Sequence, residues 1–234
     1  MNAPADVIVK LEQVTRVYQQ DSVAVNALGG IDLEIRRGDF AVLVGPSGSG
    51  KTTLLNLIGG LDSPTTGRVW VAGTEIGRMS RAELSDVRLR KIGFVFQEFN
   101  LIPVLSALDN VEFVMLLQGM PDAERRARSV ALLEELGLTG LEHRRPAELS
   151  GGQQQRVAVA RAIAAEPIIV LPDEPTANLD SKAGAALMDL MRRLNEEKGA
   201  TFVFSTHDAM VVERARRVIR MRDGRIESDE RRVA

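Results

Sequence analysis

Residues 40–58 read FAVLVGPSGSGKTTLLNLI, and this stretch is the most informative part of the chain. Phe40–Val44 is a continuous apolar run, which predicts a buried strand. From Thr52 to Ile58, leucine and isoleucine recur at helical spacing, which predicts a helix. The segment between them is framed by glycines and ends in lysine and threonine. A strand, a loop of this composition and a helix in that order are typical of a phosphate-binding loop.

The chemistry of this loop suits a nucleoside triphosphate. Glycines let the backbone curl until successive N–H groups point inward, and the positive end of the following helix adds to them. Lys51 supplies a full charge beside the β- and γ-phosphates, and the Thr52 hydroxyl can be a ligand of Mg²⁺. The alternative is a glycine-rich turn with an incidental lysine, which the flanking strand and helix disfavour. The expected phosphate-binding residues are Gly45, Pro46, Ser47, Gly48, Ser49, Gly50, Lys51, Thr52 and Thr53.

Composition and net charge exclude several kinds of partner and site. The chain has 234 residues and a net charge of -2, so there is no overall basic field, and we expect no nucleic-acid partner. Cysteine is absent, which excludes disulfides, thiolate metal sites and cysteine nucleophiles. The first residues lack the pattern of an export signal, and no apolar run approaches the roughly 20 residues that span a bilayer. We therefore expect a cytoplasmic protein that contacts a membrane only through a partner.

Hydrophobic periodicity outside the loop predicts an α/β protein. Apolar runs, some alternating and some continuous, predict strands at residues 7–11, 31–35, 69–72, 92–96, 168–171 and 201–204. Helical spacing predicts helices at residues 81–89, 106–119, 121–137, 154–164 and 182–197. Strands and helices alternate in the last third of the chain, as expected for a parallel sheet. The arginines of residues 214–232 are mixed with acids, so we interpret this segment as a solvated surface.

An acidic pair follows the apolar run at residues 168–171. Phosphates bind beside the carboxyl ends of parallel strands, which we call the carboxyl edge of the sheet, and both acids are expected there. Asp173 is suited to the Mg²⁺ shell, and Glu174 is suited to contact the water that attacks the γ-phosphate. Alternatively, such a pair could only cap a strand or helix. Pro172 stands directly before the pair and lacks a backbone donor, so strand pairing is expected to stop a residue early.

A second anion-binding end is expected at Leu149–Gln153, which reads LSGGQ and precedes a helix. A plain helix cap is the alternative. Together with the phosphate-binding loop and Asp173–Asp180 (DEPTANLD), this segment resembles the nucleotide-binding cassette of the ABC family. The resemblance extends from Val7 to about Glu227. The residues expected to face a second ATP are Ser150, Gly151, Gly152 and Gln153.

The resemblance implies a fold, a reaction and an assembly. The fold is an α/β P-loop NTPase with a RecA-like parallel sheet, an N-terminal antiparallel β subdomain and an inserted α-helical subdomain. The reaction is hydrolysis of ATP with Mg²⁺. The assembly is a head-to-tail homodimer, because the serine-glycine motif of one subunit closes over the ATP held by the other.

Single residues acquire roles through the same resemblance. Tyr18 would stack on adenine, although it could also be a half-buried strand residue. Gln97 would sense Mg²⁺ and the attacking water, and His207 would contact the γ-phosphate. Asp180 would join the two sites across the dimer, with helix capping as its alternative. His143 has no such context and is interpreted as structural.

The middle of the chain resembles the part of the family that meets the membrane. Residues 85–161 would be the helical subdomain, and residues 1–84 and 162–228 the catalytic lobe. The apolar segment 99–105 would suit a coupling helix of an integral membrane permease, or alternatively the protein's own core.

Within the family, residues 58–62 and 94–103 resemble the lipoprotein-releasing and macrolide-export branch, LolD and MacB. That branch implies a peripheral place on the cytoplasmic face of the inner membrane. Because MacB-type proteins often carry their membrane part on the same chain, an end at Ala234 would indicate a stand-alone subunit or an excised domain. The rival interpretations are a soluble ABC ATPase of DNA repair or translation, and a regulatory ATPase that moves no substrate.

Overall fold

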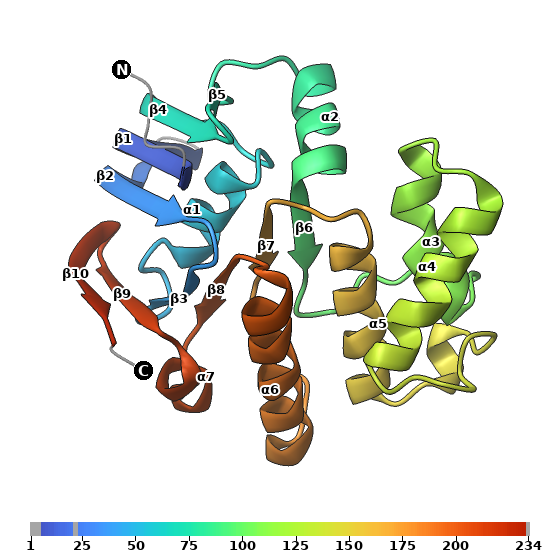
Figure 1. The fold of residues 1–234 in the computed structure, drawn as a ribbon. Coiled ribbons are helices and arrows are strands. Elements are labelled where there is room, and N and C mark those ends of the chain that lie inside the picture. The colour runs from blue at the N-terminus through green and yellow to red at the C-terminus, as the bar shows by residue number, and fades with distance from the viewer. Residues whose placement is uncertain (1–5, 21–22, 233–234) are drawn as a thin grey trace.

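Two β-sheets and a set of helices make up the computed structural model, which describes residues 6–20 and 23–232 (Figure 1). A four-stranded antiparallel sheet has the order β2-β1-β4-β5, and its strands are β1 (Val7–Gln20), β2 (Val23–Arg36), β4 (Thr66–Val71) and β5 (Thr74–Glu75). A six-stranded sheet has the order β10-β9-β3-β8-β7-β6. Its strands are β3 (Phe40–Val44), β6 (Ile92–Val95), β7 (Ile169–Pro172), β8 (Phe202–Thr206), β9 (Arg217–Arg222) and β10 (Arg225–Arg231).

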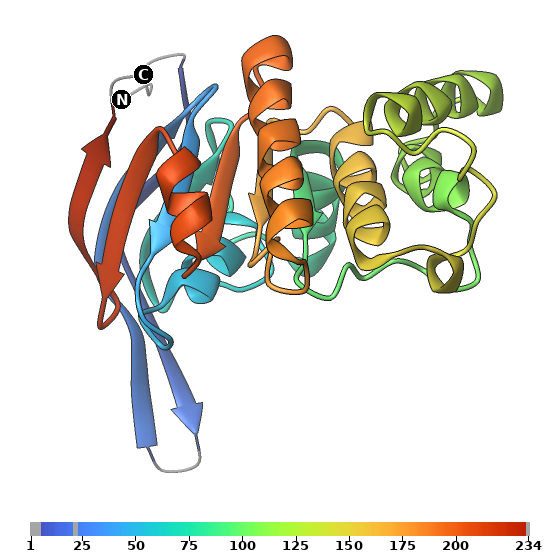
Figure 2. The same cartoon turned by 90° about the horizontal axis from the view of Figure 1, so that it is seen from below.

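The six-stranded sheet is parallel except for β10, which pairs antiparallel with β9. The helices are α1 (Lys51–Ile58), α2 (Arg81–Lys91), α3 (Ala107–Leu117), α4 (Asp122–Glu135), the short η1 (Pro146–Glu148), α5 (Gly151–Ala164), α6 (Ser181–Lys198) and α7 (Ala209–Arg214). In Figure 1, α3 and α4 lie together on the side of the molecule opposite the four-stranded sheet. Figure 2 shows that β1 and β2 form a long ribbon that extends beyond the rest of the chain. The predicted fold class is confirmed.

Both faces of the parallel sheet are covered, and alternate residues of β3 enter two different cores. Val42 belongs to the core that contains residues of β8 and α3 to α6, whereas Ala41 and Leu43 belong to the core that contains residues of α1 and the four-stranded sheet. A strand buried on both faces reads as a continuous apolar run, which is why Phe40–Val44 shows no alternation. Of the helices described, none has both the length and the apolar character needed to cross a bilayer.

The expectation that Pro172 ends strand pairing early is wrong. Pro172 still pairs with Val95 of β6. The next two N–H groups continue the ladder on both sides, since Asp173 donates to the Val95 carbonyl at 2.9 Å and Glu174 to the Ser205 carbonyl at 2.9 Å. The proline therefore removes a single donor, and the two acids are held firmly at the edge of the sheet.

The interpretation of residues 214–232 as a solvated surface is also wrong for part of the segment. It contains β9 and β10, and the Arg217 side chain is buried. Its guanidinium donates to Asp39 at 2.7 Å and to Asp229 at 2.6 Å, so two carboxylates compensate the buried charge. Arg222, on the same strand, is exposed as expected.

Candidate nucleotide-binding and catalytic site

The loop between β3 and α1 is curled around the Lys51 side chain. The ammonium donates to the carbonyl oxygens of Gly45 at 2.8 Å and Pro46 at 3.1 Å, and the Lys51 side chain is almost fully buried. Gly48 and Gly50 have φ values of 80° and 96°, which only glycine adopts easily. The loop therefore folds back on Lys51, and two of its glycines adopt the left-handed conformations that a tight curl requires.

Close packing behind the loop fixes its position. A Cβ atom on Gly45 would lie 2.2 Å from the Met221 carbonyl oxygen of β9, so no larger residue fits there. The turn between β9 and β10 is tied to the loop, because the Gly224 N–H donates to the Ser49 carbonyl at 3.2 Å. The same turn is tied to β2, since the Gly29 N–H donates to the Gly224 carbonyl at 2.9 Å. The β9–β10 hairpin thus holds the phosphate-binding loop in place through Met221 and Gly224.

Thr52 and Asp173 meet at the edge of the sheet, although they are far apart in the sequence. The Thr52 hydroxyl donates to Asp173 Oδ1 at 3.3 Å. Burial raises the pKa of Asp173 and the neighbouring Glu174 raises it further, whereas the nearby Ser205 side chain, the hydrogen bond from Thr52 and the charge of Lys51 lower it.

The oxygens of Thr52 and Asp173 are hard donors of the kind that Mg²⁺ prefers. No group of three or more His, Cys, Asp or Glu residues suited to a metal is found in residues 6–20 and 23–232. A Mg²⁺ ion usually takes one or two carboxylates together with waters and phosphate oxygens, so this donor set fits it.

Glu174 lies beside Asp173 and is held by two side chains from the end of β8. Its Oε2 accepts a hydrogen bond from the Thr206 hydroxyl at 3.0 Å, and its Oε1 lies 2.8 Å from Nδ1 of His207. Glu174 has a φ of 47°, a left-handed conformation that is uncommon for this residue type. The carboxylate is largely buried, and the His207 ring is mostly exposed. Sequence reasoning missed Thr206, whose only signal is its place at the end of β8.

Gln97 is brought to the same edge by the pairing of β6 with β7. It stands two residues after Val95, whose carbonyl accepts from Asp173. The Gln97 side chain is exposed, and the Gln97 backbone carbonyl accepts a hydrogen bond from the Asn178 side-chain amide at 2.9 Å. Asn178 belongs to the loop after Glu174, so the two loops are joined directly. Sequence reasoning did not identify this contact, because it depends on two segments that meet only in the fold.

Ser150 and Asp180 both cap helices within the single chain. The Ser150 hydroxyl accepts from the Gln153 N–H at 3.3 Å, while the Gln153 side chain accepts from the Ser150 N–H at 2.9 Å. Asp180 accepts from the Ala183 N–H at 2.8 Å and so begins α6. Ser150 is exposed and opens α5, which packs with α3 and α4, whereas the phosphate-binding loop precedes α1 on the side of the four-stranded sheet (Figure 1).

Tyr18 lies in β1 and is only partly buried. Its hydroxyl donates to Asp62 at 2.7 Å, and the Arg16 guanidinium lies 4.5 Å from the centre of the Tyr18 ring. Arg16 also pairs with Asp62 at 2.8 Å. The ring is therefore fixed by a local polar cluster, which the sequence analysis did not foresee.

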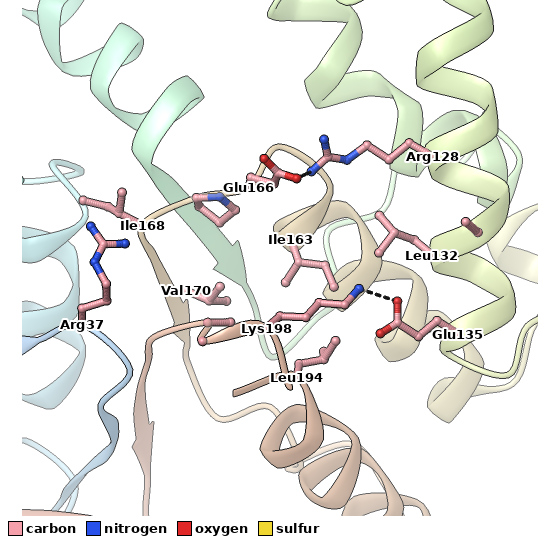
Figure 3. Close-up of a pocket in the computed structure, with 14 residues that line it drawn as sticks. Arg37, Arg128, Leu132, Glu135, Ile163, Glu166, Ile168, Val170, Leu194 and Lys198 are labelled. Atoms are coloured by element: carbon pink, nitrogen blue, oxygen red, sulfur yellow. Dashed lines mark hydrogen bonds and ion pairs between the residues drawn. The ribbon is translucent and has the colours of Figure 1, made fainter. Parts of the chain in front are cut away.

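A separate cavity of about 440 Å³ lies at the opposite edge of the parallel sheet (Figure 3). It is lined by residues that precede or begin β7, such as Ile168 and Val170, and by α4 and α6. Two ion pairs border it, Arg128 with Glu166 and Lys198 with Glu135, each at 2.6 Å. None of the expected site residues lines this cavity. Ligands of parallel sheets bind at the carboxyl ends of the strands, whereas this cavity lies beside their amino ends.

The chain is similar to ATP-binding proteins of known families. Residues 28–177 match the family model described as ABC transporter. The lipoprotein-releasing system ATP-binding protein LolD 1 of Rhodopseudomonas palustris is 47% identical over 95% of this chain and 99% of its own. The macrolide export ATP-binding/permease protein MacB of Brucella melitensis is 46% identical over 95% of this chain and 34% of its own.

A solved structure agrees with these relatives. The ATP-binding cassette MJ0796 of Methanocaldococcus jannaschii, a dimer bound to ADP and Pi, has a TM-score of 0.89 and 44% identity. The match covers 97% of this chain and 100% of that one. These similarities do not favour a soluble repair or regulatory ATPase. The chain therefore belongs to the ABC transporter family and is an ATP-binding, ATP-hydrolysing subunit of the LolD and MacB type.

Proposed function

We propose that ATP and Mg²⁺ bind at the carboxyl edge of the parallel sheet. The N–H groups of Gly45 and of residues 47–53 and the Lys51 ammonium would hold the β- and γ-phosphates. Thr52 and Asp173 would hold Mg²⁺, with Gln97 as a further oxygen donor from the next strand. When bound, Mg²⁺ would offset the charge of the phosphates. Tyr18 would stack on the adenine ring.

Glu174 is the proposed general base. Its carboxylate would accept a proton from the attacking water, while Thr206 and His207 keep it oriented. The His207 ring is mostly exposed, and it would contact the γ-phosphate as well. One observation carries the proposal: the adjacent residues Asp173 and Glu174 each have a suitable partner. Asp173 contacts Thr52, and Glu174 contacts His207. Mg²⁺ binding and water activation would thereby lie side by side.

The complete site would require two copies of the chain. Ser150–Gln153 and the phosphate-binding loop lie on different parts of one chain, so a head-to-tail pair could place each Ser150 hydroxyl near the other chain's nucleotide. Asp180 would then contact the opposite subunit. The dimer reported for the archaeal cassette MJ0796 supports this arrangement.

Exposed apolar side chains at the two ends of α3 are the proposed contact with a membrane permease. Val104, Leu116 and Leu117 are 73%, 52% and 57% exposed, whereas Leu101 packs on the core. Such side chains suit the apolar face of a partner's coupling helix. The chain would contact the inner membrane on its cytoplasmic side only through this permease, and the similarity to LolD and MacB favours lipoprotein release or export as the transport process.

The proposed subdomains follow from the sheet. Residues 85–161 were expected to form the helical subdomain, but β6 at 92–95 belongs to the parallel sheet. We therefore propose that the helical subdomain begins near residue 96, with the remaining residues in the catalytic lobe.

Mixed variants test the shared site. Lys51→Ala and Ser150→Phe would each be inactive alone. In a head-to-tail heterodimer both lesions fall in one site, and the other site keeps an intact Lys51 and an intact Ser150. Mixing the two inactive proteins should restore up to about a quarter of the wild-type ATPase activity, because random pairing makes half of the dimers mixed and each has one good site. A mixture with no more activity than its components would contradict the shared site.

A further inference from the structure

Arg161, in the last turn of α5, reaches across to the loop that follows Gln97. One arm of its guanidinium donates to the Phe99 carbonyl at 2.9 Å, and the other arm donates to the Asn100 carbonyl. The planar guanidinium therefore clamps two consecutive peptide groups. Such a fork positions its partners more strictly than a single donor could.

The loop that Arg161 clamps is in an unfavourable backbone conformation. Phe99 has a φ of 58° and Asn100 a φ of 47°, both in the left-handed region. Bulky residues such as phenylalanine rarely adopt this region, and it persists only where surrounding contacts enforce it. The Phe99 ring also lies near the serine-glycine segment, since its Cζ is 3.8 Å from the position of a Cβ on Gly151.

Arg161 has no acidic partner among the residues that the structure describes. Burial alone lowers its pKa, so its charge is partly desolvated without a carboxylate to compensate it. A charge in this situation costs stability, and an apolar side chain would fill the same space more cheaply. The contacts of Arg161 with the loop are therefore the feature that explains its presence.

Other contacts connect the same helix to the loop after Glu174. The Gln155 amide of α5 donates to the Pro175 carbonyl at 2.9 Å. Farther along that loop, the Asn178 amide donates to the Gln97 carbonyl at 2.9 Å. The helix that begins at Ser150 thus holds both loops that carry the proposed catalytic side chains.

We propose that Arg161 is a positioning residue for ATP hydrolysis. By clamping Phe99 and Asn100, it keeps Gln97 at the edge where Mg²⁺ and the attacking water would lie. This inference rests on the role proposed for Gln97 above. It adds a residue that contacts neither nucleotide nor metal and acts through the backbone of the loop.

The test compares two arginines of α5. Arg161→Met removes the clamp, and Arg156→Met is the matched control, because Arg156 donates to the Leu136 carbonyl of the neighbouring helical region at 3.3 Å and not to the loop. Steady-state ATPase activity, the Mg²⁺ concentration for half-maximal activity, binding of a fluorescent ATP analogue and thermal melting would be measured for each. Gln97→Ala and the double variant with Arg161→Met complete the set.

For Arg161→Met we expect kcat to fall by about 10- to 100-fold, as for other small misplacements of catalytic groups. The half-maximal Mg²⁺ concentration should rise, and affinity for the analogue should change by less than about threefold, since the phosphate-binding loop is untouched. Adding Arg161→Met to Gln97→Ala should cause little further loss of kcat, because both changes act through one side chain.

The inference is overturned if Arg161→Met matches Arg156→Met in kcat and Mg²⁺ dependence, or if its effect multiplies fully with that of Gln97→Ala. If Arg161→Met does not fold, Arg161→Lys takes its place in the test. Lysine keeps the charge but offers no fork, so wild-type kcat and Mg²⁺ dependence in that variant would also overturn the inference. By contrast, a Gln97→Ala variant with wild-type kinetics would refute the proposed role of Gln97 itself.

Discussion

Replacing Glu174 with glutamine is the sharpest perturbation of the proposed chemistry. Glutamine has nearly the same shape, and its carbonyl can still accept the Thr206 hydroxyl bond seen at 3.0 Å. Its amide nitrogen cannot accept a proton, so the general base is lost. A positioned base contributes roughly 10²- to 10⁴-fold to a rate, which corresponds to about 3–5 kcal/mol of transition-state stabilisation.

The assay separates binding from hydrolysis. Phosphate release should fall by about 10²-fold or more. Binding of a fluorescent ATP analogue should stay within about threefold of wild type, since Glu174 is not part of the phosphate-binding loop. With ATP and Mg²⁺, light scattering after size exclusion should show a dimer that persists, because the γ-phosphate is not removed.

Glu213→Gln is the matched control, since Glu213 is exposed on α7 and should leave all readouts unchanged. The reasoning is refuted if Glu174→Gln hydrolyses ATP at a rate within about threefold of wild type. A variant that remains monomeric at saturating ATP would contradict the proposed assembly.

Three further predictions concern the supports of the site. Gly45→Ala should abolish ATP-analogue binding and lower the free energy of unfolding by about 1–3 kcal/mol, because the alanine Cβ would lie 2.2 Å from the Met221 carbonyl oxygen. Analogue titration measures the loss of binding, and urea unfolding measures the loss of stability. Arg217→Met should cost about 3–5 kcal/mol in urea unfolding, since it leaves the buried Asp39 carboxylate partly uncompensated. Asp173→Asn should be more stable than wild type at pH 7 without nucleotide, because burial raises the pKa of Asp173. The folded protein binds the Asp173 proton more tightly than the unfolded chain does, so the gain in stability should shrink as the pH falls through this raised pKa. Urea unfolding over a pH series measures the gain.

Each of these predictions has its own contrary result. For Gly45, wild-type affinity for the analogue would show that the loop can move away from β9. For Arg217, the control is Arg222→Met on the exposed face of β9. An equal loss of unfolding free energy in the two variants would contradict the role of Arg217 in compensating Asp39. For Asp173, a stability difference that does not depend on pH would be contrary.

The sequence predicted those parts of the molecule that are specified locally. The phosphate-binding loop follows from glycines and lysine next to a strand and a helix, and the structure has that strand and helix almost at the expected residues. The helix predicted at residues 106–119 begins at Ala107, directly after Ser106, which caps it. The expected edge position of Asp173 is also confirmed, because the order of strands and helices implies a parallel sheet.

The rest depends on contacts between distant segments. Thr206, Asn178 and Arg161 reach their partners only through the fold, and the sequence around them does not show which atoms they contact. Pro172 was misjudged because a lost donor was weighed without the two N–H groups that follow it. Arg217 was misjudged because charge mixing describes a segment, whereas burial depends on which strand lies beside it.

The most direct measurement uses the absence of cysteine from the chain. Cysteine would be introduced at Arg222, an exposed residue of β9 beside the phosphate-binding loop, in one preparation and at Glu148, near Ser150, in another, both in the Glu174→Gln background. Each would carry a spin label, and the distance between labels would be measured in the mixture with and without ATP and Mg²⁺. The account predicts a short, well-defined distance between chains that appears only with ATP. A distribution without any short distance at saturating ATP would contradict a nucleotide shared by two chains.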